Sequence, residues 1–231
     1  IGILGGMGTQ AGLDFCNKLA MLNRGKTDQK YPLFVLYNKS NIPGRPENLH
    51  QYNKVLKSLY AGCLLLQKNK CKFIVIPCNT AHFWYDDLKK KIKIPIISMP
   101  KEVWFHAKNN CKKDSKIGIL ATEATLKTNV YHKYFDKSFK LISPKKSLQI
   151  KNVNKAIKYV KMGKIKDAEK AIKPAVNYLI KMKCKKIILG CTELPIAIFA
   201  FKSFKKIKKS KIFLDPNLIL ANVSMKKYKS S

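Results

Sequence analysis

The chain has 231 residues, 46% of them hydrophobic, which is enough to bury the core of one large domain or two small ones. The formal net charge of +34 suggests a polyanion as partner, but only Arg24 and Arg45 are arginines, and the lysines are scattered through every segment. Because base and phosphate recognition favour arginine, we attribute the charge to solvated faces and expect no specific nucleic-acid partner. Such a surface still attracts small dicarboxylates. No apolar run approaches the ~20 residues that span a bilayer, so no membrane partner is expected.

Strand-like and helix-like segments alternate along the chain. Runs of branched residues predict strands, and apolar residues at every third or fourth position predict helices. The first half is predicted to contain a strand at 1–4, a helix at 10–23, a strand at 32–38, a helix at 49–69, a strand at 73–76, a helix at 80–90 and a strand at 94–98. The second half is predicted to contain a strand at 117–120, a helix at 122–135, a strand at 139–143, helices at 153–162 and 164–182, strands at 187–190 and 211–214, and a helix at 218–227. The stretch 144–150 has the least pattern and is predicted as a loop.

The two halves of the chain resemble each other. The sequence I-G-I-L at 1–4 matches I-G-I-L at 117–120, and C-K-F-I-V-I-P-C at 71–78 matches C-K-K-I-I-L-G-C at 184–191. The offsets between the matching positions are nearly equal, which indicates an αβ unit present twice. Alternating strands and helices predict parallel sheets covered by helices.

Each repeated strand ends in a cysteine, Cys78 in the first half and Cys191 in the second. In parallel sheets, ligands gather at the carboxyl ends of the strands. A helix follows each cysteine, so we expect the helix dipole to lower the pKa of both thiols. Two thiols that face each other can take a proton from one side of a carbon and return one to the other side. This chemistry predicts racemisation without a cofactor.

The other five cysteines are interpreted as small core residues. They are Cys16, Cys63, Cys71, Cys111 and Cys184. Seven cysteines without a CxxC pair argue against a disulfide framework or a zinc site, and they predict a reducing, cytoplasmic location. His82 lies four residues after Cys78, and its position is compatible with a base and with a capping or packing residue.

The glycines at 2–8 follow a predicted strand and precede a predicted helix. Their spacing does not match the G-x-G-x-x-G pattern of dinucleotide-binding turns, and the Gly-Lys-Ser/Thr ending of a phosphate-binding loop is absent. We therefore expect them to bring the backbone close to a small ligand or to form a tight turn.

With these residues in view, the chain resembles the aspartate/glutamate racemase family, and within it the aspartate racemase branch. The resemblance runs through the whole chain and rests on G-I-L-G-G-M-G at 2–8, P-C-N-T-A-H at 77–82, L-A-T-E-A-T at 120–125 and G-C-T-E-L-P at 190–195. The glycine motif and the glutamate after Cys-Thr differ from glutamate racemases, which carry Asp-Ser-Gly and Cys-Thr-His there. Thr9, Gly12 and Gly44 depart from the usual residues of the branch, which bears on fine substrate selectivity.

The resemblance implies two similar parallel-sheet α/β domains related by pseudo-twofold symmetry, with the active site in the cleft between them. The first domain is expected to span 1–100 plus 210–231 and the second 101–209, so that the last strand and helix return to the first domain. The implied protein is a cytoplasmic homodimer of D-amino acid metabolism. Its substrate would be a small amino acid, and nothing in the sequence asks for pyridoxal phosphate or a metal.

The implied reaction is the racemisation of aspartate, with glutamate left open. One catalytic cysteine would remove the Cα proton as a thiolate while the other delivers a proton as a thiol. The loop I-P-G-R at 42–45 and the helix end V-K-M-G at 160–163 match two carboxylate-binding segments of the branch. The residues that the resemblance assigns are Cys78 and Cys191 for catalysis and Met7, Gly8, Arg45, Asn79, Thr80, Thr122, Thr125, Lys161 and Thr192 for substrate binding. The remaining alternatives are a two-cysteine isomerase of a small diacid and an inactive relative that binds an amino acid or a nucleic acid.

Overall fold

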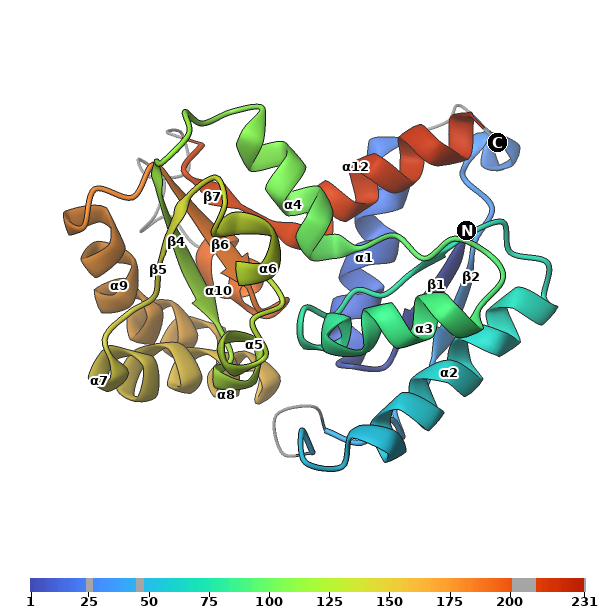
Figure 1. Ribbon diagram of the computed structural model, residues 1–231, viewed down its shortest axis with the longest axis horizontal. Coiled ribbons are helices and arrows are strands. Elements are labelled where there is room, and N and C mark those ends of the chain that lie inside the picture. The colour runs from blue at the N-terminus through green and yellow to red at the C-terminus, as the bar shows by residue number, and fades with distance from the viewer. Residues whose placement is uncertain (24–26, 45–47, 201–210, 231) are drawn as a thin grey trace. The chain divides into compact units, whose positions relative to one another are not determined.

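The computed structural model describes residues 1–23, 27–44, 48–200 and 211–230 (Figure 1). The chain divides into two compact units, Ile1–Glu102 with Asn217–Ser231, and Val103–Pro216. Each unit is built on one parallel β-sheet, which confirms the predicted α/β class. The chain passes from the first unit to the second within α4 (Met99–Lys108) and returns at the start of α12 (Pro216–Lys229).

The first sheet has the strand order β2-β1-β3, with β1 (Gly2–Gly5) in the centre. Strand β2 (Val35–Asn38) and strand β3 (Ile74–Val75) both run parallel to it. The strand predicted at 94–98 is reduced to a single bridge between Ile74 and Ile96. Because the strands are parallel, the carboxyl ends of all three lie at the same edge of the sheet.

Strand β1 is buried on both faces, and its alternating side chains enter two different cores. Leu4 packs with α2 (Tyr52–Lys68), where Gly62 leaves the space that Leu4 fills. Ile3 packs on the opposite face with residues of α1 (Thr9–Leu22) and α12. A short strand can hold both helix layers because its side chains alternate with a period of two.

The second sheet has the order β5-β4-β6-β7. Its strands are β4 (Lys116–Ala121), β5 (Lys140–Ile142), β6 (Lys186–Gly190) and β7 (Phe213–Leu214). The central β4 corresponds to β1, β5 to β2, β6 to β3, and β7 to the bridge at Ile96, so the repeat seen in the sequence is a repeat of topology. Strand β7 pairs with β6 and therefore belongs to the second unit. The expectation that the last strand returns to the first domain is wrong.

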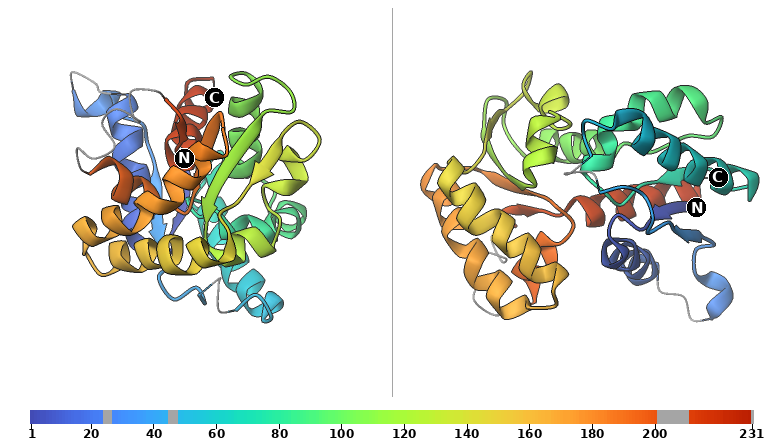
Figure 2. Two further views of the ribbon diagram at one scale, coloured as in Figure 1. Left: turned by 90° about the vertical axis from the view of Figure 1, so that its left-hand side faces the viewer. Right: turned by 90° about the horizontal axis from the view of Figure 1, so that it is seen from below.

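The long helix α9 (Ile165–Lys181) packs on the second sheet (Figure 2). Leu179 lies over Gly118 of β4, at a distance that leaves no room for a Cβ atom. Before α9 in the chain, α7 (Lys146–Leu148), η3 (Gln149–Asn154) and α8 (Lys155–Lys161) follow one another without a break. The loop predicted at 144–150 is therefore wrong from Lys146 onward, where the chain is helical.

Other helical segments differ from the predictions in their continuity, their type or their presence. The helix predicted at 122–135 is divided into α5 (Glu123–Lys127) and α6 (His132–Phe135), because Asn129 adopts a left-handed φ of 52°. The helix predicted at 80–90 begins as the 3-10 helix η2 (Thr80–Trp84) and continues as α3 (Tyr85–Lys91). Helix α4 was not predicted. The other short helices are η1 (Asp28–Lys30) and α10 (Leu194–Phe199).

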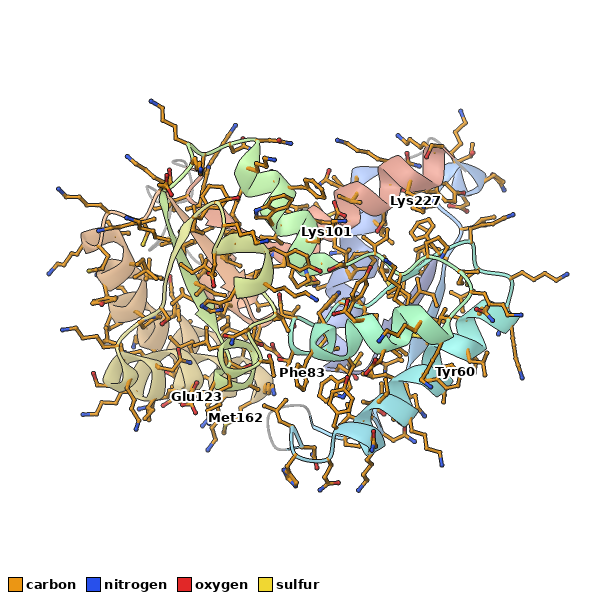
Figure 3. The ribbon with its side chains drawn as sticks, in the orientation of Figure 1. Tyr60, Phe83, Lys101, Glu123, Met162 and Lys227 are labelled. Carbon is orange, nitrogen blue, oxygen red and sulfur yellow. The ribbon has the colours of Figure 1, made fainter. Side chains whose placement is uncertain are left out.

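Lysine side chains project from the outline of both units (Figure 3). Lys227 on α12 lies over the ring of Phe73, with its Nζ 5.8 Å from the ring centre. Two ion pairs join described side chains that lie close together within one helix, Lys18 with Asp14 on α1 and Lys90 with Asp87 on α3. Among the same residues, no helix is both long and apolar enough to cross a bilayer.

A glycine substitution in the turn after β1 tests why the turn is built as it is. Gly6 has a φ of +88°, and a Cβ atom there would lie 2.3 Å from the carbonyl carbon of Lys39. We expect Gly6→Ala to lower the free energy of unfolding by roughly 1–3 kcal/mol, since both the backbone conformation and the clash oppose it. Chemical denaturation followed by circular dichroism measures the change.

The matched control is Gly12→Ala in α1. Its Cβ would lie 3.4 Å from the Cα of Gly5, an ordinary contact, and alanine favours a helix over glycine by ~1 kcal/mol. This variant should be at least as stable as the wild type. Equal stabilities for the two variants would contradict the account of the turn.

Candidate active-site residues in each unit

The glycine-rich turn brings the end of β1 against the loop that follows β2. Met7 is buried in the same core cluster as Cys78, and Gly8 directly precedes α1. Asn38 at the end of β2 donates from Nδ2 to Oγ1 of Thr9, at 3.2 Å. The turn is thus fixed to the carboxyl edge of the first sheet, as predicted for a tight turn.

Cys78 follows β3 at the same edge of the sheet. Its side chain is only 6% exposed, and its N–H donates to the carbonyl of Ile76 at 2.7 Å. Asn79 and Thr80 are buried beside it. Cys78 precedes η2, which continues directly into α3, and the side chain of Asn79 makes no cap hydrogen bond.

His82 holds the backbone of Cys78 in place. Its Nδ1 lies 2.9 Å from the carbonyl oxygen of Cys78, and the N–H of Met99 lies 3.0 Å from its Nε2. A carbonyl can only accept and an amide N–H can only donate, so Nδ1 carries the proton and Nε2 accepts. Because both ring nitrogens are engaged with the backbone, His82 links the cysteine loop to the first residue of α4 and takes the packing role of the two that the sequence left open.

In the second unit, the threonines of the L-A-T-E-A-T motif form a cap at the end of β4. Thr122 precedes α5, and its Oγ1 accepts from the N–H of Thr125 at 3.2 Å. The two hydroxyl oxygens are 3.0 Å apart. Since Ala121 pairs with Gly190 in the sheet, the next residues, Thr122 and Cys191, leave neighbouring strand ends.

A network of hydrogen-bonded polar side chains contacts the end of β4. Glu123 Oε1 accepts from Asn154 Nδ2 at 2.9 Å, and Asn154 Oδ1 accepts from Gln149 Nε2 at 2.8 Å. Gln149 also donates to the carbonyl of Ala121, at 2.9 Å. Figure 3 labels Glu123 where this network meets α5. Sequence reasoning missed these residues, because Gln149 lies in the stretch predicted as a loop.

Cys191 lies in a strongly charged environment. Its Sγ donates to Oε2 of Glu193 at 2.9 Å, and the hydroxyl of Thr192 donates to the same oxygen at 3.3 Å. Burial and the carboxylate of Glu193 raise the pKa of the Cys191 thiol well above its usual value. The backbone N–H of Glu193 and the charge of Lys161 act in the opposite direction. The prediction of a lowered pKa is therefore wrong for Cys191, because α10 begins three residues later and Glu193 stands between.

Tyr131 is a buried neighbour of this thiol that the sequence did not indicate. Burial raises the pKa of its hydroxyl, and the charge of Asp215, and of Cys191 whenever it is a thiolate, raises it further. Tyr131 therefore stays protonated at neutral pH. No pattern in the sequence connects it with Cys191, since the two residues come from different helix–strand connections.

The candidate residues divide between the two units. The first unit contains Met7, Gly8, Cys78, Asn79 and Thr80, at the ends of β1 and β3. The second contains Thr122, Thr125, Lys161, Cys191 and Thr192, at the ends of β4, β6 and α8. Arg45 lies outside the described residues.

Comparison with known proteins identifies the family of this chain. The family model for Asp/Glu/Hydantoin racemase matches residues 4–222. The chain belongs to this racemase family. A solved structure of the aspartate racemase of Picrophilus torridus is similar with a TM-score of 0.83 and 27% identity, over 99% of this chain and 94% of that one.

Two curated relatives give further context within the racemase family. The broad specificity amino-acid racemase RacX of Bacillus subtilis is 26% identical over 201 residues, which is 84% of this chain and 85% of RacX. The glutamate racemase of Corynebacterium diphtheriae is 26% identical over 168 residues, or 70% of this chain and 60% of that protein. Racemases with different substrate ranges are therefore similarly distant in sequence.

The role of His82 can be tested by its tautomer and by its removal. We expect ¹⁵N-resolved NMR to find Nδ1 protonated and Nε2 unprotonated, with the signals assigned by their loss in His82→Ala. His82→Ala should also lower the free energy of unfolding, because it leaves two buried backbone groups unpaired at a cost of about 1–3 kcal/mol each. His50→Ala, which removes an exposed ring, is the control. A proton on Nε2, or equal stability of the two variants, would contradict the assignment.

Proposed function

We propose that this protein is a cofactor-independent amino-acid racemase that interconverts L- and D-aspartate by a mechanism with two cysteines. The observation that carries the proposal is the equivalent position of Cys78 and Cys191. Each follows the strand that pairs with the central strand of its sheet, β3 beside β1 and β6 beside β4. Membership in a racemase family and the likeness to an aspartate racemase at 27% identity support it.

In the proposed reaction, the thiolate of one cysteine takes the Cα proton, and the electron pair of the broken bond stays on the substrate. The thiol of the other cysteine then delivers its proton to the opposite face of Cα. The side chains of Asn79 and Thr80 and the backbone N–H of Thr192 would donate hydrogen bonds to the carboxylate as negative charge develops on it. The protein would need to place the two thiols on opposite sides of one carbon.

The substrate range depends on whether the protein recognises a second carboxylate. Lys161 is exposed, and its positive charge acts to lower the pKa of the Cys191 thiol. It is therefore suited to bind an anionic group beside that thiol. Arg45 is proposed as the second cation, on the strength of its match to the I-P-x-R loop. RacX of Bacillus subtilis is described as having broad specificity, and two other relatives as aspartate and glutamate racemases. Aspartate is therefore the substrate we propose first, and glutamate is the next to test.

The cysteine variants test the proposal directly. We expect Cys78→Ser and Cys191→Ser each to reduce racemisation of aspartate in both directions to near background, because every turnover needs one thiolate and one thiol. Loss of optical rotation or circular dichroism of each enantiomer measures the rate. Cys111→Ser, which changes a half-buried cysteine of the second unit, should retain wild-type turnover. Substantial activity in either catalytic variant would overturn the two-cysteine mechanism.

The Lys161 variant tests the substrate class. Lys161→Met keeps an unbranched side chain that is one atom shorter and removes the charge, so it should weaken turnover of aspartate far more than that of alanine. Lys158→Met, one turn earlier on α8 and also exposed, is the matched control. Comparable kcat/KM for aspartate and alanine, unchanged in Lys161→Met, would favour a broad specificity that does not depend on this lysine.

A further inference from the structure

The strongest unassigned chemistry lies beside Cys191, where a second acid shares its buried site. The exposed fractions of the side chains are 8% for both Cys191 and Glu193, so little water reaches either. Oε2 of Glu193 accepts hydrogen bonds from the thiol at 2.9 Å and from the hydroxyl of Thr192 at 3.3 Å. Two acids at this distance cannot both ionise without a large electrostatic cost, so the pair retains one proton at neutral pH.

The backbone keeps this pair together. Glu193 directly precedes α10, and its carbonyl accepts from the N–H of Ala197 at 3.2 Å. The N–H of Leu194 donates to the carbonyl of Cys191 at 3.0 Å, which closes a tight turn over the three residues. The side chain of Glu193 therefore returns toward the sulfur through a short, fixed segment and not through a flexible loop.

We propose that Glu193 is the proton partner of Cys191: its carboxylate holds the thiol protonated in the free enzyme and exchanges a proton with it during turnover. The inference rests on the proposed function, and it names a residue that acts through Cys191 and does not touch the substrate. It also makes the two cysteines unequal, with Cys191 as the resting acid.

The protons balance in both directions of the reaction. When Cys191 acts as the acid, Cys78 starts as the thiolate and takes the Cα proton. The S–H bond of Cys191 breaks and its proton joins Cα, which leaves a thiol at Cys78 and a thiolate at Cys191 beside the carboxylate. Cys78 then releases its proton to solvent, and a proton from solvent enters on Oε2 of Glu193 and passes to the sulfur. The opposite direction is the reverse of these steps: the proton of Cys191 moves to Oε2 of Glu193 and from there to solvent while Cys78 takes one up, and the Cys191 thiolate then takes the Cα proton as the Cys78 thiol delivers its own.

Other groups around Cys191 also affect the pKa of its thiol. Lys161 on α8 and the backbone N–H of Glu193 favour the thiolate, while burial and the Glu193 carboxylate oppose it. Tyr131, from the connection before α6, and Asp215, whose charge acts on Tyr131, are two further titratable groups of this neighbourhood. Of these, Glu193 is the group whose side chain has a hydrogen bond from the sulfur, so its removal should have the largest effect.

The test measures the thiol and not the turnover. Alkylation of Cys191 by iodoacetamide is followed over a range of pH by peptide mass spectrometry in the wild type and in Glu193→Gln. The amide has the shape of the carboxylate but carries no charge and cannot accept the proton. We expect the pH midpoint of Cys191 alkylation to fall in this variant, since the carboxylate charge that favours the thiol has been removed while the burial of the thiol remains. Cys111 in the same samples serves as the internal reference, because its pKa is set by burial and by Lys186.

Glu169→Gln is the matched control variant, because it neutralises a different buried carboxylate of the same unit, on α9. It should leave the midpoint of Cys191 where it is in the wild type. Glu193→Asp, which keeps the charge but shortens the side chain, should give a midpoint between those of the wild type and Glu193→Gln. An unchanged midpoint in Glu193→Gln would overturn the inference, whether or not the protein is a racemase.

A kinetic readout separates this inference from the proposed function. Loss of the last proton from the two cysteines limits kcat/KM at high pH, and in the wild type that proton is held by Cys191. The alkaline limb of the pH profile should therefore move to lower pH in Glu193→Gln, equally for both enantiomers because the equilibrium constant of racemisation is one. A shifted alkylation midpoint in a protein that racemises no amino acid would reject the proposed function and retain the acid pair. A shifted midpoint with an unchanged alkaline limb would overturn the role of Glu193 in turnover.

Discussion

Parallel pairing around one central strand in each unit is the constraint on which the rest of the structure depends. Strands β1 and β4 are buried on both faces, so every neighbouring strand must be joined to them by a helix that crosses a face of the sheet. The carboxyl ends of the strands then meet at one edge, where the chain must turn. That edge receives the glycine-rich turn and Cys78 in one unit, and the threonine cap and Cys191 in the other.

The order of the elements and the position of the cysteines could be predicted because they follow from local patterns. The repeated I-G-I-L and cysteine-terminated strands are visible in the sequence, and strand ends are where parallel sheets gather functional residues. The destination of β7 could not be predicted this way, because its partner β6 is chosen by the geometry of the sheet. The helical segment at Gln149–Asn154 was missed for a related reason: its polar residues form hydrogen bonds with β4 and α5 that only the folded chain brings together.

The roles of the individual polar side chains were the least predictable part of the site. His82 was compatible with a base until its second ring nitrogen was seen to accept from Met99, a residue seventeen positions away. Glu193 was noticed only as a mark of the aspartate branch, since a sequence does not reveal that the side chain turns back to the sulfur two residues earlier. The expected lowering of the Cys191 pKa failed because a nearby carboxylate outweighs a helix of six residues that begins beyond it.

The repeat places the two thiols in equivalent positions, but the residues around the two thiols differ. Around Cys78, a neutral histidine supports the backbone, and the neighbouring core is apolar. Around Cys191, a carboxylate, a lysine and a tyrosine determine where its proton resides. A racemase that is chemically symmetric in its reaction could thus be asymmetric in its resting state.

The measurement that tests the central claim most directly is the fate of the α-proton in deuterated water. L-aspartate and, separately, D-aspartate are incubated with the protein, and the α-proton of each enantiomer is followed by NMR together with the enantiomeric composition. Two thiols on opposite faces predict that the enantiomer formed early carries deuterium at Cα while the remaining substrate still carries its proton. Product that keeps the proton of its substrate, or deuterium that enters the substrate without inversion, would contradict the two-cysteine account.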